Sequence, residues 1–250
     1  MVEKELKSDV IEHTPAHVHI QLCNSRPVLS SAAYNGGLID AEHLLIVKVA
    51  ENFLGSRGPF EPLSETFRNY CRQHGWSGNT VGMMTSAPMT SYRNARRSMQ
   101  GVEITALVTA GLSNARRSGD PADHRAFDAA GIKPGTINII ILTNAILSPA
   151  AQVEAVMMAT EAKAAVLQDI GATSPVTGKT ATGTGTDAVA VVSGFTTPKI
   201  VFCGKHTLFG EMLASATMEA LSSSLGTPNS ELICQANSMR SQSRGSGRPY

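Results

Sequence analysis

The segment from Thr177 to Asp187, TGKTATGTGTD, constrains this chain more than any other, because it is too polar to enter a core. Its glycines permit turns with positive φ and let the backbone approach a ligand closely. Its threonines offer hydroxyl donors and acceptors. The run Ala188–Val192, AVAVV, follows directly and has the length and composition of a buried strand. We therefore predict a ligand-facing loop with Asp187 at the mouth of a strand; a plain surface connection is the alternative.

Composition excludes several classes of protein. The chain has 250 residues, 42% of them hydrophobic and 16% charged, which is enough to bury the core of one domain. Its net charge of +1 argues against a nucleic-acid partner. No run of about eighteen apolar residues predicts a membrane span, and the polar N-terminus lacks the apolar region of a signal peptide. We therefore expect a cytoplasmic protein.

The cysteines and histidines predict no metal site. The four cysteines are scattered without a CxxC pair, at Cys23, Cys71, Cys203 and Cys234. His17 and His19 share one face of a predicted strand, but the sequence offers no third ligand beside them. We interpret them as two exposed histidines.

Hydrophobic periodicity predicts a chain that mixes strands with helices. The predicted strands cover residues 17–22, 28–33, 79–85, 106–110, 139–145, 188–192 and 199–203. The predicted helices cover 41–54, 62–75, 148–171 and 207–225. Because strands follow one another in adjacent pairs, we expect an α/β fold in which a mixed, largely antiparallel sheet packs against helices.

The organisation predicted from these elements is a single compact domain. Residues 1–16 are polar and without a period, which predicts a flexible arm. The domain then covers residues 17–225. Residues 226–250 are rich in serine, glycine and arginine, which predicts a disordered tail.

Three apolar stretches end alike, in threonine and small polar residues. They are VGMMTSA at 81–87, ALVTAGLSNA at 106–115 and IIILTNA at 139–145. If these ends lie side by side, one rim of the sheet is lined by Thr85, Thr109, Thr143, Ser113, Asn114 and Asn144. The alternative is that small residues at strand ends only serve tight turns.

The helix predicted from Ser148 to Gly171 begins with a serine N-cap and a proline at its first position. We expect its buried stripe to contain Val153, Val156, Met157, Thr160, Ala164 and Leu167. Glu161 lies among small residues, ATEAKAAV, where a partly buried carboxylate could act as a general base. A solvent-exposed glutamate is the alternative.

Common catalytic motifs are missing. The Gly-Lys-Thr triplet at 178–180 is not a phosphate-binding loop, because Thr173 occupies the position of the motif's first glycine. The sequence contains no GxSxG, HExxH or GxGxxG pattern. Serine hydrolase, zinc protease and dinucleotide-binding functions therefore have no support.

From about Val18 to Leu225 the chain resembles the adenosylcobinamide amidohydrolase family of corrinoid salvage. The resemblance is carried by six motifs in order: VLSSAAYNGG at 28–37, VTAGLSNARRSGD at 108–120, GTINIIILTNA at 135–145, ATEAKAAVLQDIG at 159–171, ATGTGTDAV at 181–189 and GKHTLFGE at 204–211. It implies hydrolysis of the amide that joins aminopropanol to the corrin ring, giving adenosylcobyric acid. The corrinoid is then the substrate, and no separate cofactor is implied.

Amide hydrolysis requires a nucleophile, donors for the oxyanion and a proton for the leaving amine. The candidate acid–base groups are Glu161, Asp187 and His206. The candidate substrate-binding residues are Asn35, Gly36, Ser113, Asn114, Asn144, Thr182, Thr184 and Lys205. Water is the nucleophile we favour, because no serine or cysteine carries a nucleophile signature; a threonine of the central loop is the alternative.

Two other functions stay open at the level of sequence. One is a binding protein that holds a corrinoid or another metal chelate without cutting it. The other is a hydrolase of a related chelate that bears an amide. The sequence also leaves open whether the chain forms a homo-oligomer.

Overall fold

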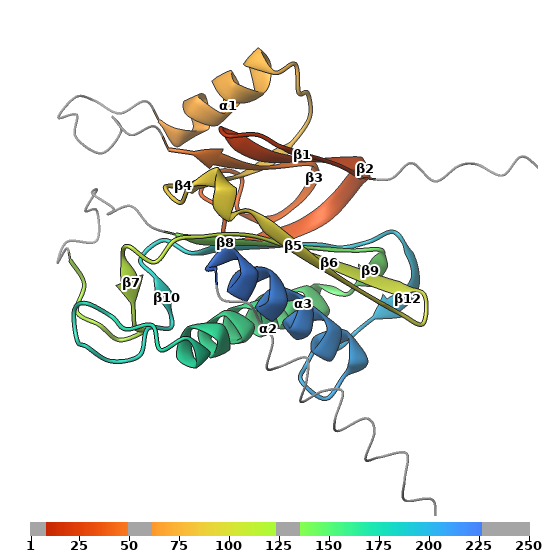
Figure 1. Cartoon of the computed structure of the whole chain (residues 1–250). Coiled ribbons are helices and arrows are strands. Elements are labelled where there is room, and N and C mark those ends of the chain that lie inside the picture. Colours follow the sequence, from red (N-terminus) through yellow and green to blue (C-terminus); the bar gives the residue numbers. More distant parts are fainter. Residues whose placement is uncertain (1–8, 50–61, 124–135, 227–250) are drawn as a thin grey trace, which may run out of the picture.

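The computed structural model describes residues 9–49, 62–123 and 136–226. Its elements are stacked in layers (Figure 1). Helix α1 (Leu63–Gln73) covers a layer of N-terminal strands, a second layer of strands lies beneath them, and helices α2 (Pro149–Asp169) and α3 (Leu208–Ser224) cover its far face. The predicted helices at 62–75, 148–171 and 207–225 are thereby confirmed to within a few residues.

The strands form one large sheet and two short ladders. The large sheet has the order β4-β3-β2-β11-β8-β6-β5, with β1 paired to β2. The strand bounds are β1 Val10–His13, β2 His17–Ser30, β3 Gly37–Lys48, β4 Thr80–Thr85, β5 Arg93–Met99, β6 Val102–Ala110, β7 Ala115–Arg116, β8 Ile137–Thr143, β9 Ala145–Leu147, β10 Gly183–Thr184, β11 Ala188–Val192 and β12 Thr196–Ile200. Within the large sheet only β3–β4 and β8–β11 are parallel. The expected mixed, largely antiparallel α/β fold is confirmed.

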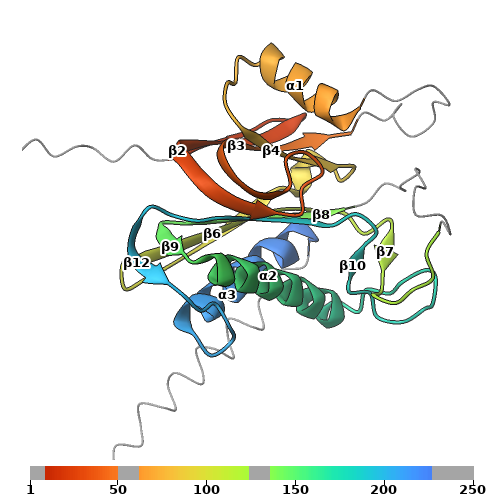
Figure 2. The same ribbon diagram turned by 180° about the vertical axis from the view of Figure 1, so that it is seen from behind.

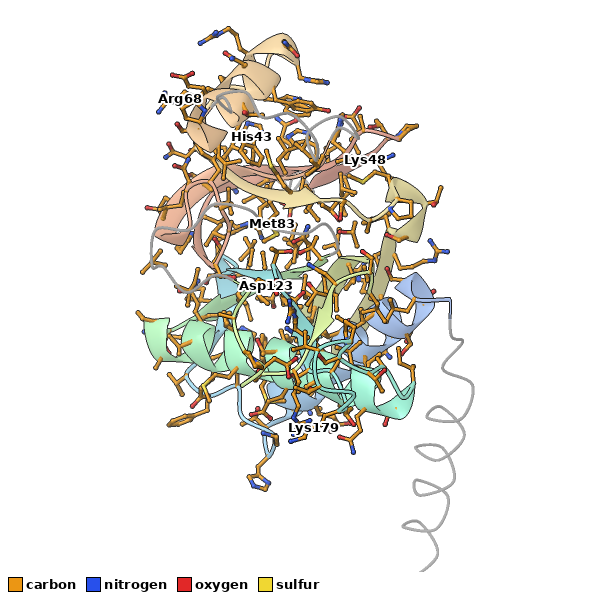
Figure 3. The ribbon with its side chains drawn as sticks, turned by 90° about the vertical axis from the view of Figure 1, so that its left-hand side faces the viewer. His43, Lys48, Arg68, Met83, Asp123 and Lys179 are labelled. Carbon is orange, nitrogen blue, oxygen red and sulfur yellow. The ribbon has the colours of Figure 1, made fainter. Side chains whose placement is uncertain are left out.

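The sheet folds over itself, which places its first strands above its last ones. The register of β2 against β3 shifts between Gln21 and Arg26, where the long hairpin bends. As a result the end of β4 comes back over the start of β8, and Asn138 Nδ2 donates a hydrogen bond to the Met84 carbonyl at 3.0 Å. Met83 lies between the two strand layers (Figure 3).

Strand β8 shows how the sequence fills both sides of the lower layer. Ile137, Ile139 and Ile141 face the helices, whereas Ile140 and Leu142 face the upper strands. All of these side chains are buried, which is expected of a central strand covered on both faces. A third apolar cluster, with Phe67 at its centre, joins α1 to the upper strands.

The helix predicted over residues 41–54 is wrong, because residues 37–48 form β3. All five residues from His43 to Val47 are buried, since one face of β3 meets α1 and the other meets the lower layer. A continuous apolar run of this kind has no strand period, so the sequence does not distinguish it from a helix. Residues 50–54 of that prediction lie outside the described residues.

The predicted buried stripe of α2 is also largely wrong. Val153 and Met157 are more than half exposed, and the buried face is instead rich in alanine, with Ala151, Ala155, Ala159 and Ala162. Small side chains let α2 pack closely against α3 and the sheet, so the larger apolar residues are left outside. Strand β5, rich in arginine, was not predicted as a strand.

The predicted flexible arm contains an ordered strand, because β1 pairs with β2 from Val10 to His13. Asp9, just before it, forms a buried ion pair with Arg26 at 2.5 Å. Residues 1–8 and 227–250, which include nearly all of the predicted tail, lie outside the described residues. None of the helices in the described ranges is long and apolar enough to cross a membrane.

His17 and His19 are buried, which corrects the prediction that they are exposed. They lie with His43 and Trp76 beneath α1, and His43 is labelled on that side of the sheet in Figure 3. We call His17, His19, His43 and Trp76 the histidine cluster. Helix α1 covers this face of β2, so both faces of the strand are buried. The alternation of histidine and apolar residues therefore does not indicate a solvent-exposed face.

Candidate functional site

One edge of the sheet brings together segments that are far apart in the sequence. Strand β6 runs antiparallel to β8 and β11 runs parallel to it, so the end of β6 meets the starts of β8 and β11. The end of β2 joins them, because Ser31 exchanges hydrogen bonds with the backbone of Val189. We call this the site edge.

Two loops form a platform beyond the site edge, over residues 111–123 and 172–187. Strands β7 and β10 pair within it, at Gly183 with Arg116 and Thr184 with Ala115. Figure 2 shows these two short strands side by side beyond the end of α2. Asn114 lies beside the second loop, since a Cβ added at Gly185 would be 3.4 Å from its Nδ2.

Asp120 and Thr182 fasten the two loops to each other. Asp120 accepts hydrogen bonds from the hydroxyls of Ser174 and Thr177, at 2.5 Å and 2.8 Å. These bonds lower the pKa of the Asp120 carboxyl, and the bond from the Ser174 hydroxyl has the largest effect. Thr182 Oγ1 accepts from the backbone of Ser118 at 2.9 Å. The threonine-rich loop is therefore held in place by hydrogen bonds to its partner loop.

Asp187 is bonded on both carboxylate oxygens. Oδ1 accepts from the Ile137 amide at 3.0 Å and from the Thr184 hydroxyl at 2.5 Å. Oδ2 accepts from the Thr184 amide at 3.0 Å and from Lys163 Nζ at 2.5 Å. The Asp187 side chain therefore closes the threonine-rich loop, links it to β8 and pairs with the ammonium group of Lys163 on α2.

Lys163 is the functional candidate that the sequence prediction missed. Its side chain is 9% exposed and that of Asp187 is 11% exposed, so this is a buried ion pair. Gly183 makes the pair possible, because a Cβ there would overlap Asp187 Oδ2 and lie 2.9 Å from Lys163 Nζ. A lysine on the alanine face of a helix, one turn after Ala159, was the available signal, but the predicted stripe placed that face outside.

Thr109 and Asn138 line the site edge on the side of the upper strands. They are direct partners in the β6–β8 register, and both are fully buried. Among the described residues, Thr109 Oγ1 and Asn138 Oδ1 have no hydrogen-bond partner. Two adjacent polar atoms of this kind are unusual in a protein interior.

The predicted shared rim is wrong for Thr143 and Asn144, which lie at the opposite edge. The reason is the antiparallel pairing of β6 with β8, which separates the two C-terminal ends. Asn144 clamps the β5–β6 turn there, accepting from the Glu103 amide at 2.8 Å and donating to the Gly101 carbonyl at 2.9 Å.

Three further candidates gather on the outer surface of the helices. Glu161 forms an ion pair with Lys205, and both side chains are about half exposed or more. Two residues along a helix turn it by about 200°, so Glu161 and Lys163 point in nearly opposite directions. His206 follows Lys205 and is exposed. The structure therefore does not bring Glu161, Lys205 or His206 to Asp187.

Asn35 and Gly36 occupy the turn between β2 and β3. Asn35 has a positive φ of 52°, and its side chain donates to the Thr80 carbonyl at 2.9 Å. Gly36 lies against the Ala32 carbonyl with no room for a Cβ. Both residues shape the turn that follows the site-edge end of β2.

Residues 3–232 match the family model described as adenosylcobinamide amidohydrolase. The chain belongs to the adenosylcobinamide amidohydrolase family. It is 30% identical over 207 residues to the adenosylcobinamide amidohydrolase of Methanosarcina mazei, covering 78% of this chain and 88% of that protein. It is 35% identical over 153 residues to an uncharacterized protein of Methanocaldococcus jannaschii, covering 56% of this chain and 60% of that protein's length.

A crystal structure of a Pyrococcus horikoshii OT3 protein matches with a TM-score of 0.41 and 12% identity, over 88% of this chain and 84% of that one. A likeness this low carries no argument about fold or function. The family assignment therefore rests on the sequence matches.

The motifs that carry the family resemblance map onto the site edge with one exception. Those at 28–37, 108–120, 135–145, 159–171 and 181–189 contribute the end of β2, the two loops, the start of β8, Lys163 and Asp187. The motif at 204–211 forms the start of α3, whose N-cap is Thr207. The family pattern thus concentrates around the Lys163–Asp187 pair.

The cysteines in the described ranges are poor nucleophiles for an amidohydrolase. Burial raises the pKa of the Cys203 thiol to about 12, and the nearby Glu154 carboxylate acts in the same direction. Cys71 is buried as well. Within the described ranges, no group of three or more His, Cys, Asp and Glu side chains has a metal-binding arrangement.

Proposed function

We propose that this chain hydrolyses the amide between aminopropanol and the corrin ring of adenosylcobinamide, releasing adenosylcobyric acid for cobamide salvage. The observation that supports this proposal is the meeting of five family motifs, separated by up to about 150 positions of sequence, at the site edge around Asp187. Residues brought together in this way from one family pattern are better explained by a shared ligand than by five separate turns.

In this proposal water attacks the amide carbon, the carbonyl oxygen becomes an oxyanion, and the C–N bond breaks as the amine takes a proton. The platform residues Ser113, Asn114, Thr182 and Thr184 contact the corrinoid. Asp187 acts mainly as a positioning residue, because four donors already occupy its two oxygens. Glu161 and His206, which lie away from the site edge, have no role in the reaction.

Incubation of the purified protein with adenosylcobinamide in water enriched in ¹⁸O tests the proposal. We expect mass spectrometry to find free aminopropanol and adenosylcobyric acid with one ¹⁸O atom in its new carboxylate. Unchanged adenosylcobinamide that nevertheless binds to the protein would support the alternative, a corrinoid-binding protein without hydrolase activity. If the protein neither bound adenosylcobinamide nor formed product, both functions would be contradicted.

A further inference from the structure

The buried ammonium group of Lys163 makes only one hydrogen bond to the described residues. An ammonium group has three N–H donors. In the part of the chain that the structure describes, Lys163 Nζ has a single partner, Asp187 Oδ2, at 2.5 Å. Burying a cation is unfavourable unless its donors are satisfied. Two N–H donors of a nearly buried ammonium are therefore available at the site edge.

A purely structural role explains this arrangement poorly. A buried ion pair rarely stabilises a fold more than well-packed apolar residues of the same size do. Apart from Gln152, the other buried residues of α2 are all apolar, so an apolar residue at this position would match its neighbours. Instead this position is a lysine whose ammonium pairs with Asp187, and the absence of a side chain at Gly183 leaves the space that the pair occupies.

We propose that Lys163 is a catalytic residue of the hydrolysis, held in place by Asp187, and that its free N–H groups bind the carbonyl oxygen of the scissile amide. This inference rests on the proposed function. As water adds to the carbon, the π electron pair of the carbonyl moves to its oxygen, and the ammonium stabilises the negative charge. When the tetrahedral intermediate collapses, the C–N bond breaks and the amine leaves with the proton that the attacking water lost. The ammonium keeps its own protons throughout.

The chain offers a matched control in the ion pair of Arg26 with Asp9. That pair has the same 2.5 Å separation, and its side chains are 4% and 19% exposed. It lies near the opposite edge of the sheet, because Arg26 Nη1 also donates to the Thr143 carbonyl at 3.4 Å. Lys163→Met and Arg26→Met each remove one buried cation from a carboxylate, so both are expected to lower Tm.

The test measures kcat, KM and Tm for adenosylcobinamide hydrolysis by the wild type, Lys163→Met and Arg26→Met, well below the lowest Tm. We expect Lys163→Met to lower kcat by roughly 10²–10³-fold with KM changed less than about threefold, the loss typical of one oxyanion donor. Arg26→Met should keep wild-type kcat. Lys163→Met with near-wild-type kcat, or an equal loss of kcat in both variants, would overturn the inference.

A second variant keeps the test decisive if Lys163→Met does not fold. Lys163→Met combined with Asp187→Asn removes both charges of the pair, so no unpaired charge is left, and the new side-chain amide oxygen still accepts a hydrogen bond from the loop. We expect this protein to fold and to bind adenosylcobinamide, with kcat as low as that of the single variant; wild-type kcat would overturn the inference. Wild-type turnover is measured first, since its absence contradicts the proposed function itself.

Discussion

The buried histidines of the histidine cluster are expected to make the stability of this protein depend on pH. His43 Nε2 donates to the Ser77 carbonyl at 2.8 Å, so His43 Nδ1 accepts the hydrogen bond from His19 Nε2 at 3.0 Å. His19 also stacks on Trp76, with ring centroids 3.7 Å apart. Burial, together with the neighbouring histidines, lowers the pKa of His19 from 6.5 to about 4. Burial also lowers the pKa of His17, although Glu12 opposes this shift.

The sign of the resulting pH dependence follows from these lowered pKa values. Between pH 6.5 and about 4 the unfolded chain binds a proton at His19 and the folded chain does not, so protonation favours unfolding. We expect Tm to be highest above pH 6.5 and to fall steadily through this window. His19→Gln should flatten the fall, whereas His206→Gln, at an exposed position, should leave it unchanged. Equal pH profiles for wild type and His19→Gln would show that the cluster does not control acid stability.

Gly183 is the residue on which the geometry of the Lys163–Asp187 pair depends. In Gly183→Ala the new Cβ would overlap Asp187 Oδ2, so the carboxylate must shift away from the loop amides and from Lys163. We expect a loss of about 1–3 kcal/mol of unfolding free energy, measured in urea, and a clear loss of turnover. At Gly204 no atom lies within 4 Å of an added Cβ, which makes Gly204→Ala the control. Equal stability of the two variants would contradict the tight packing at Gly183.

Of the two residues of the Lys163–Asp187 pair, the sequence pattern singles out only Asp187. Asp187 was recognisable because it separates a glycine–threonine loop from an apolar run. Lys163 was not, because the helix contains two apolar faces, and the face with the larger side chains is the exposed one. The sequence pattern instead favours Glu161, which lies two residues away and points to the opposite side of the helix.

Among the elements, β1 is an ordered strand where the sequence predicts a flexible arm, and a truncation can test what this strand contributes to stability. The polar N-terminus is predicted to be a flexible arm, but β1 pairs with β2 and Asp9 neutralises the buried Arg26. Removal of residues 1–14 deletes both contacts and leaves a buried guanidinium without its carboxylate. We expect this truncation to cost about 3–5 kcal/mol of stability.

Removal of residues 1–8 alone is the control for that truncation, because it leaves Asp9 and β1 in place. We expect its Tm to equal that of the intact chain. If removal of residues 1–14 also left Tm unchanged, neither β1 nor the Asp9–Arg26 pair would contribute measurably to stability.

The elements that were predicted well are those with local signals. Helix α2 begins at Ser148, whose hydroxyl accepts from the Ala151 amide at 3.1 Å, as the Ser-Pro start indicated. Strand β3 was missed because its apolar residues are buried from two sides by partners distant in sequence. No local sequence pattern indicates such partners. Whether this segment forms a helix or a strand therefore depends on tertiary contacts that cannot be read from the sequence.

For the molecule as a whole, the decisive feature is that the sheet folds back over itself and so creates a buried polar corner at the site edge. The sequence predicts the mixed sheet but not that the sheet folds over itself, because this depends on the bend in the β2–β3 hairpin. The corner is closed by Asn138, whose amide nitrogen donates to Met84 at the end of β4. This bond joins the upper strand layer to the lower one.

Replacement of Asn138 tests whether that bond holds the two layers together. Asn138→Ala removes the bond and some volume, whereas Asn138→Leu removes the bond and keeps the volume. If the hydrogen bond matters, both variants leave the Met84 carbonyl without this donor, and each should lose about 1–3 kcal/mol of unfolding free energy. Amide hydrogen exchange should then accelerate in β4 more than in the β6–β8 ladder, because β4 lies at one end of the sheet order and the ladder lies within it. Stability retained by Asn138→Leu alone would mean that Asn138 only fills space, and that apolar packing between the layers suffices to fold the sheet.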